Sequence, residues 1–268
     1  MTDYLYENPP LVEVIADLQW EIAPVRSIPV PNAGLDTFYP QAAKALKANQ
    51  RLSEYVHHEA LTPPDVPIEF FAHQPLIRLR KKASTWPLYQ LGPGLWTTNI
   101  TPPYNGWAEF RPTLENGLMA LSECYPAYSE TLKVRRVELR YLDAFPLRKS
   151  GLTYSELVRK AFHVTAALPQ SISQQAGDEI PIDFQGEFTF PILSAPGRQG
   201  VIKIASGVAR EEPSVILEVA ARSFEENQST VPADLLACFD QLHVNVRSWF
   251  EELITDEMRQ SFGAKREV

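Results

Sequence analysis

Apolar and polar side chains alternate along residues 12–20, with Val14, Ala16 and Leu18 on one side of the chain and Asp17 and Gln19 on the other. A period of two predicts a strand with one apolar face. The same alternation returns at residues 134–147, where apolar positions 137, 139 and 141 alternate with charged ones. The pattern therefore predicts two long strands in distant parts of the chain.

Two segments instead carry apolar side chains every three or four residues, which is the spacing of one helix face. They are residues 107–125 and 235–253, and Asp234 is the expected N-cap of the second. Shorter helices are predicted at residues 35–46 and 153–166. Thr153 and Glu156 have the spacing of a capping box, which supports the latter start.

Short apolar runs bounded by proline and glycine predict the remaining strands. They are residues 68–73, 76–80, 89–100, 182–190, 200–209 and 214–222, and the third should be broken at Gly92-Pro93-Gly94. The order strand, helix, three strands, long helix thus occurs twice, in residues 1–133 and 134–268. Because the junction is short and runs straight into a strand, we expect one integrated domain.

These elements predict an α+β fold. We expect a large, mostly antiparallel sheet built from two similar β-α-β-β-β-α halves, with the long helices packed on one face. The other face is then either an ordinary solvated surface or, if the sheet curls toward a half-barrel, a concave groove.

Charged side chains share one face of three predicted strands, and both halves contribute. These candidate site residues are Arg78, Arg80, Arg136, Glu138, Arg140, Glu218 and Arg222. On a solvated face they would form cross-strand ion pairs. In a groove the arginines would converge, held by the glutamates, and would bind an anionic small molecule or an acidic peptide. Arg140 lies mid-strand at the junction of the halves, and we expect its partner to be Glu138, Glu218 or Glu13.

Composition narrows the possible functions. Of 268 residues, 44% are hydrophobic, which favours a folded core over disorder. There is no leader at Met1 and no long apolar run, so we expect a cytoplasmic protein without a membrane span. Cys124 and Cys238 are expected to be buried thiols. The histidines have no metal-site spacing, and no cofactor motif occurs, so we expect neither a metal nor a cofactor.

No phosphate loop, nucleophile elbow or zinc helix is present, which favours a binding or regulatory module over an enzyme. The alternative is an enzyme that acts on a phosphorylated or nucleotide substrate. Asp143 would suit proton transfer there if burial raises its pKa, although a structural hydrogen bond to a backbone amide is the competing interpretation.

The sequence allows two kinds of macromolecular partner. Basic clusters at residues 78–82 and 133–136 suggest nucleic acid. Trp86, Tyr89 and Trp96 lie near the first cluster, where the rings could stack on bases or pack in the core. A net charge of -8 argues against it, because it repels a phosphate backbone. The helix from Leu235 to Leu253 resembles a coiled-coil seam, so it either covers the sheet or forms a homodimer.

Three motifs carry a family resemblance. They are Asn8-Pro9-Pro10-Leu11-Val12-Glu13-Val14, Leu139-Arg140-Tyr141, and Trp249-Phe250 with Ile254-Thr255-Asp256-Glu257-Met258-Arg259 and Phe262-Gly263. Together they resemble a sporadically distributed family of uncharacterised prokaryotic proteins of about this length. The resemblance implies no activity. The family's patchy occurrence implies an accessory role in regulation, or an interaction subunit in defence or toxin control. Members usually have a small residue where this chain has Glu138, which weakens a shared role for that carboxylate.

Overall fold

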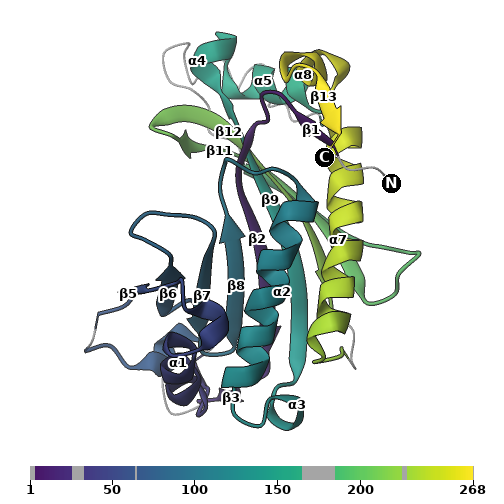
Figure 1. The fold of residues 1–268 in the computed structure, drawn as a ribbon. Coiled ribbons are helices and arrows are strands. Elements are labelled where there is room, and N and C mark those ends of the chain that lie inside the picture. Colours follow the sequence, from purple (N-terminus) through teal and green to yellow (C-terminus); the bar gives the residue numbers. More distant parts are fainter. Residues whose placement is uncertain (1–3, 26–32, 64, 165–184, 225–227, 268) are drawn as a thin grey trace.

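The computed structural model describes residues 4–25, 33–63, 65–164, 185–224 and 228–267. Its centre is an open nine-stranded sheet in the order β10-β11-β12-β9-β2-β8-β7-β6-β5 (Figure 1). The strands are β2 (Leu11–Trp20), β5 (His57–Ala60), β6 (Ile77–Arg80), β7 (Leu88–Gly92), β8 (Leu95–Ile100), β9 (Val134–Pro146), β10 (Gln185–Pro191), β11 (Arg198–Ala209) and β12 (Glu212–Ser223). All neighbours are antiparallel. The α+β fold with a large antiparallel sheet is confirmed, and the sheet does not close into a barrel.

The first strands of the two halves, β2 and β9, pair with each other at the centre of the sheet. Each of them also pairs with the last strand of its own half, β2 with β8 and β9 with β12. The other strands then follow outward in reverse chain order on both sides. The two halves therefore contribute to one sheet in the same order, while a duplicated origin stays a prediction.

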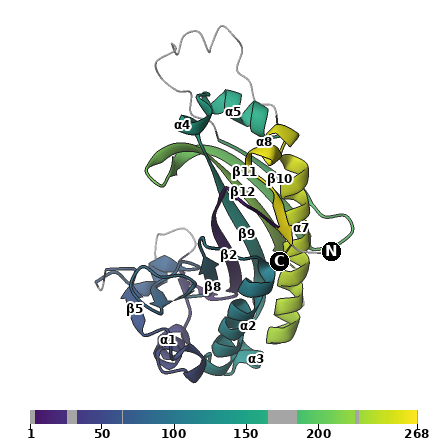
Figure 2. The ribbon, with the colours of Figure 1, turned by 45° about the horizontal axis from the view of Figure 1, so that its top comes forward.

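Helices pack on one face of this sheet and at one end of it. They are α1 (Tyr39–Lys47), α2 (Trp107–Cys124), α3 (Tyr128–Thr131), α4 (Leu147–Ser150), α5 (Tyr154–Ala161), α7 (Pro232–Leu253) and α8 (Asp256–Ser261). The long helices α2 and α7 lie side by side across the sheet, and α4, α5 and α8 gather at one end (Figure 2).

The core lies between the sheet and the two long helices. On β2, Val14, Leu18 and Trp20 are fully buried on the face toward the helices. On α7 the apolar stripe includes Phe239 and Leu242, also fully buried. The apolar side chains that alternate along the strand and those that recur along the helix therefore pack together in one core, as the sequence indicates. The predicted seam of α7 therefore covers the chain's own sheet, and dimerisation stays a prediction.

One predicted strand is wrong, and one strand of the central sheet escaped prediction. Ile68–Phe71 is a short 3-10 helix (η2) that follows Pro67, not part of a strand over residues 68–73. The edge strand β5 has the sequence His-His-Glu-Ala, in which no apolar face alternates with a polar one. The predicted strand at 89–100 is a hairpin, β7 and β8, broken where the glycines and Pro93 indicated.

Two of the shorter helices have boundaries that differ from the predicted ones, and each difference has a local cause. α1 begins at Tyr39, because the Asp36 side chain accepts hydrogen bonds from the backbone N–H groups of Phe38 and Tyr39, both at 3.1 Å. The capping box of Thr153 is present, but α5 ends at Ala161, where Phe162 bridges to Ile254. Residues 165–166 and 182–184 lie outside the described part.

The last long helix also begins earlier than expected. Val231 is its N-cap, and Asp234 lies in the first turn. Cys124 and Cys238 are buried and form no disulfide, as expected. Within the described residues, no helix is both long and apolar enough to cross a membrane.

Both described ends of the chain meet beside α7. β1 (Tyr4–Tyr6) pairs with β13 (Lys265–Glu267) in a separate antiparallel ladder (Figure 1). The backbone N–H of Asn8 also donates to the carbonyl of Phe262 at 2.9 Å. The first described residues are therefore held by the last ones. The remaining two-stranded ladder joins β3 (Ala23–Pro24) and β4 (Gly34–Leu35), and a 3-10 turn, η1 (Gln50–Leu52), follows α1.

Replacing Leu242 by alanine tests the core face of α7. The side chain is fully buried, so we expect the free energy of unfolding to fall by about 3 kcal/mol. Val244 lies on the same helix and is 46% exposed, so Val244→Ala should cost less than about 1 kcal/mol. Urea unfolding followed by circular dichroism measures both. Equal losses for the two variants would contradict this packing.

Candidate functional site

Polar side chains form a row across the sheet, on the face opposite to the one that α2 and α7 cover. The strand register places them directly opposite one another in the order Glu59, Arg78, Gln90, Thr97, Asp17, Glu138, Arg222. Side chains directly opposite on neighbouring strands are close enough to interact. Charged and amide groups from both halves of the chain therefore share one surface.

The part of the row nearest β5 is held by hydrogen bonds. Glu59 pairs with Arg78 at 3.2 Å and with Arg80 at 3.0 Å. In the amide orientation that satisfies both its neighbours, Gln90 accepts two hydrogen bonds from Arg78, at 2.9 and 3.0 Å, and donates one to Thr97 at 3.1 Å. These arginines are thus engaged with their own neighbours.

At the centre of the sheet the row becomes a charged group that we call the arginine cluster: Asp17, Arg136, Glu138, Arg140 and Arg222. Glu138 is 1% exposed. It accepts a hydrogen bond from Nε of Arg222, and its other oxygen lies 3.2 Å from Nη2 of Arg136. Glu138 therefore holds two guanidinium groups that come from different strands.

Asp17 is the second buried carboxylate of the cluster, and its ion pairs are long. Its oxygens lie 3.9 Å from Nη2 of Arg136 and 3.8 Å from Nη2 of Arg140. Burial raises the pKa of Asp17 to about 6, although both arginines act to lower it. The guanidinium groups therefore only partly offset the loss of water around this carboxylate.

Several polar atoms of the cluster have no hydrogen-bond partner among the described residues. They are Oδ1 of Asp17 and the Nε atoms of Arg136 and Arg140, all buried. The side chains of Arg136, Arg140 and Arg222 are 26%, 27% and 24% exposed. The arginine heads thus reach the surface side by side, and an oxyanion there could accept hydrogen bonds from two or more of them.

The structure brings together four of the seven predicted site residues: Arg136, Glu138, Arg140 and Arg222. Arg78 and Arg80 share their face of the sheet but lie four strands from β9, which is about 19 Å at about 4.8 Å per strand. Their expected convergence on Arg140 is therefore wrong. Glu218 lies opposite Lys203 and makes no ion pair with a described arginine, so its predicted role in holding the guanidinium groups is wrong too.

Sequence reasoning missed Asp17 as the partner of Arg140. We expected Glu138, Glu218 or Glu13, but Glu13 accepts a hydrogen bond from Asn99 at 2.8 Å instead. The available signal was the position of Asp17 on the polar side of the strand over residues 12–20. Its meaning depends on the pairing of β2 with β9, which no local pattern shows.

Two of the three aromatic side chains near the first basic cluster are buried and are not available to nucleic-acid bases. Tyr89 and Trp96 are each 1% exposed and stack on each other in the core, with ring centroids 5.3 Å apart. The ring of Trp86 lies 4.9 Å from the guanidinium of Arg80. No group of three metal-binding side chains occurs in the described part of the chain.

Asp143 lies on the opposite face of β9 from the cluster, since it follows Leu139 and Tyr141 at alternate positions. It is 4% exposed, and burial raises its pKa to about 7, as the sequence suggested. The expected hydrogen bond to a backbone amide is absent among the described residues. Asp143 therefore belongs to a different surface from the arginine cluster.

Replacing Glu138 by glutamine tests the cluster. The neutral amide leaves Arg136 and Arg222 without their carboxylate, and we expect a loss of about 2 kcal/mol in the free energy of unfolding. A fully buried pair would lose more, but the arginines are about a quarter exposed. Glu218→Gln, on the same face of the sheet, should change the free energy of unfolding by less than about 0.5 kcal/mol. Thermal and urea unfolding at neutral pH compare the two, and equal effects would contradict a supporting role for Glu138.

Comparison with protein-family models, with curated proteins and with the known solved structures finds no match to this chain. Its function is therefore inferred from the geometry of its own residues.

Proposed function

We propose that this protein is a binding or regulatory module that takes an anionic small molecule, or an acidic peptide group, on the arginine cluster. The observation that carries the proposal is the position of three guanidinium groups, which lie close together at the surface of the sheet. Arg136, Arg140 and Arg222 converge from two neighbouring strands and reach the surface, and the Nε atoms of Arg136 and Arg140 have no hydrogen-bond partner among the described residues.

The chemistry of arginine supports an oxyanion as the ligand. A guanidinium group is planar and offers paired N–H donors that match a carboxylate or phosphate in two places at once. The buried carboxylates of Asp17 and Glu138 lie beside these groups and fix their positions. With both carboxylates ionised, the cluster still carries one excess positive charge, which favours an anion.

The size of the ligand follows from the charge of the whole chain. A net charge of -8 repels a long polyanion, while a small anion meets mainly the local field of the cluster. The burial of Tyr89 and Trp96 also removes the aromatic platform that single-stranded nucleic acid would use. A small molecule or a short peptide group therefore fits better than a nucleic acid.

Hydrolysis of a phosphorylated or nucleotide substrate is the second candidate. Asp17 is the observation in its favour, because this carboxylate has a pKa of about 6 and an oxygen, Oδ1, that accepts no hydrogen bond from a described residue. A general base with such a pKa can accept a proton from water near neutral pH. Release of inorganic phosphate from a bound nucleotide, lost in Asp17→Asn, would favour this candidate over simple binding.

Replacing Arg140 by glutamine tests the proposed site. Isothermal titration with phosphate, pyrophosphate, succinate and citrate should identify at least one anion that binds the native chain. Arg140→Gln should weaken that binding about tenfold or more, since it removes both a charge and the paired donors. Arg140→Lys should fall between the two, because it keeps the charge alone.

Arg159→Gln is the matched control. It removes the same charge from an exposed position on α5 and should leave the affinity unchanged. The proposal fails if no anion binds the native protein, or if Arg140→Gln and Arg159→Gln weaken binding equally.

A further inference from the structure

A cavity of about 100 Å³ lies between β1, β9 and α7, on the helix side of the sheet. Tyr4, Tyr6, Tyr104, Tyr141 and Phe250 contribute aromatic rings to its walls. A cavity needs about 10–15 Å³ of such water-accessible volume to hold one water, so the space suits several waters or one small organic group. It is separated from the arginine cluster by the sheet itself.

Asp143 is the polar group of this cavity that the protein leaves without a partner. It lines the cavity, is 96% buried, and makes no hydrogen bond or ion pair with any described residue. A carboxylate in such surroundings is unfavourable unless it meets a cation or hydrogen-bond donors. Its position therefore points to a ligand that supplies one or both.

The other polar groups deep in the cavity are already joined to one another. The hydroxyls of Tyr104 and Tyr141 lie 2.9 Å apart, and that of Tyr141 lies 3.0 Å from Nδ1 of His243. Trp107 stacks on the imidazole, with ring centroids 4.6 Å apart. Burial lowers the pKa of His243 to about 4, so at neutral pH this ring has no charge to offer Asp143.

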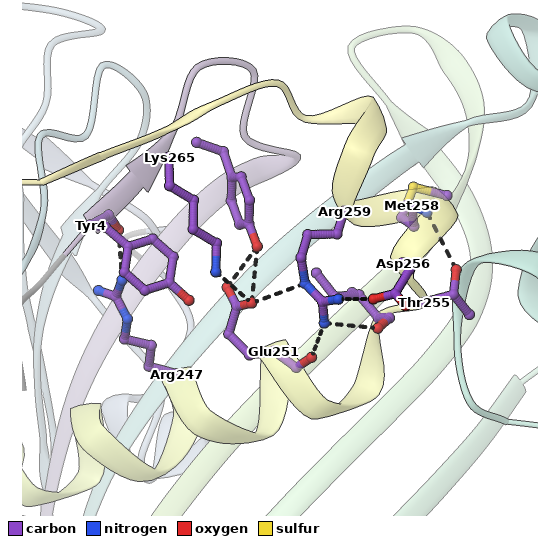
Figure 3. Close-up of polar contacts among 10 residues, drawn as sticks. Tyr4, Arg247, Glu251, Thr255, Asp256, Met258, Arg259 and Lys265 are labelled. Atoms are coloured by element: carbon purple, nitrogen blue, oxygen red, sulfur yellow. Dashed lines mark hydrogen bonds and ion pairs between the residues drawn. The ribbon is translucent and has the colours of Figure 1, made fainter.

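The charged groups near β1 hold this strand in place over the cavity (Figure 3). Glu251 accepts from the Tyr6 hydroxyl at 2.9 Å and pairs with Lys265 at 3.1 Å and Arg259 at 3.3 Å. Arg247 donates to the carbonyl of Tyr4 at 2.8 Å, and its guanidinium lies 3.8 Å from the centre of that ring. These interactions link β1 and β13 to α7 and α8.

The three motifs singled out in the sequence meet at this cavity. Pro9 and Pro10 of the opening motif, Tyr141 of the central motif and Phe250 of the ending motif all line it. Phe262, from the last motif, packs against Tyr6 with ring centroids 5.2 Å apart. Segments from both ends and the middle of the chain therefore line one pocket.

We propose that this cavity binds a small organic ammonium ion, with the charge at Asp143 and the carbon groups against the tyrosine rings. Of the charged groups in the lining, Glu251 is already paired with Lys265 and Arg259, and Arg247 is bound to the carbonyl of Tyr4, so the carboxylate of Asp143 is the charge that still lacks a partner. Aromatic faces attract organic cations through their quadrupoles, most strongly where water is excluded. The site is independent of the anion site proposed above.

Titration with butylammonium tests the proposal, with 1-butanol and butyrate as neutral and anionic probes of similar size. Chemical shifts of the Tyr141, Asp143 and His243 signals, followed by NMR at pH 8, should give saturable binding for butylammonium. The two other probes should bind at least about tenfold more weakly. Equal binding of 1-butanol, or no saturable shift with butylammonium, would overturn the proposal.

Asp143→Asn keeps the shape of the side chain and removes its charge. We expect the affinity for butylammonium to fall at least about tenfold, with unchanged near-ultraviolet circular dichroism. Asp65→Asn, which removes a carboxylate from an exposed loop position, is the matched control and should bind as the native chain does. Native affinity in Asp143→Asn would exclude Asp143 as the anchor.

A pH series on the native protein gives a test that needs no variant. Between pH 8 and 5.5 the ligand stays charged, while Asp143, with a pKa of about 7, takes up a proton. Over this range, the other titratable groups of the lining keep their charge state. His243 has a pKa of about 4, the pKa of Glu251 is lowered, and burial raises the pKa of Tyr4, Tyr6, Tyr104 and Tyr141. Arg247 stays protonated, although burial lowers its pKa. We expect about tenfold weaker binding at pH 5.5, and a flat profile would overturn the role of Asp143.

Discussion

The antiparallel pairing of β2 with β9 is the interaction on which the rest of the molecule depends. It joins the two halves of the chain at the centre of one sheet, and its register places Asp17 opposite Glu138 and Ile15 opposite Arg140. Because side chains alternate along a strand, the same register sends Tyr141 and Asp143 to the other face. Both candidate sites thus depend on one ladder, and a slip of one residue would exchange their faces.

Local patterns in the sequence were enough for most of the fold. Alternation predicted β2 and β9, and helical spacing predicted α2 and α7, because each of these elements has one face in the core. β5 escaped prediction because His57, His58 and Glu59 form a polar edge strand without an apolar face. The segment after Pro67 is apolar enough for a strand but forms a single 3-10 turn.

The candidate sites were predictable only in part, because they depend on contacts between distant segments. Arginine and glutamate at alternate positions of β9 and β12 were sufficient to indicate a charged face. The partner of Arg140 could not be predicted in this way. It is Asp17, 123 positions earlier in the chain, and the two residues meet because β2 and β9 are neighbours in the sheet. The cavity is further from local prediction, since its walls come from β1, β9 and α7 and its outer strand is held by β13.

Asp17 and Asp143 show opposite ways of keeping a carboxylate out of water. Asp17 lies beneath guanidinium groups that lower its pKa, while the pKa of Asp143 is shifted by burial alone. A pKa raised from 3.8 to about 7 in the folded state means that Asp143 binds its proton more tightly there than in the unfolded chain. Its contribution to stability is therefore present below about pH 4 and is lost as the pH rises through about 7. Each unit of that shift corresponds to about 1.4 kcal/mol, so an apolar residue at this position would give a more stable protein at neutral pH. At neutral pH, Asp143 therefore makes the folded protein less stable. A ligand that binds to its carboxylate in the aromatic cavity would explain why an aspartate occupies this position.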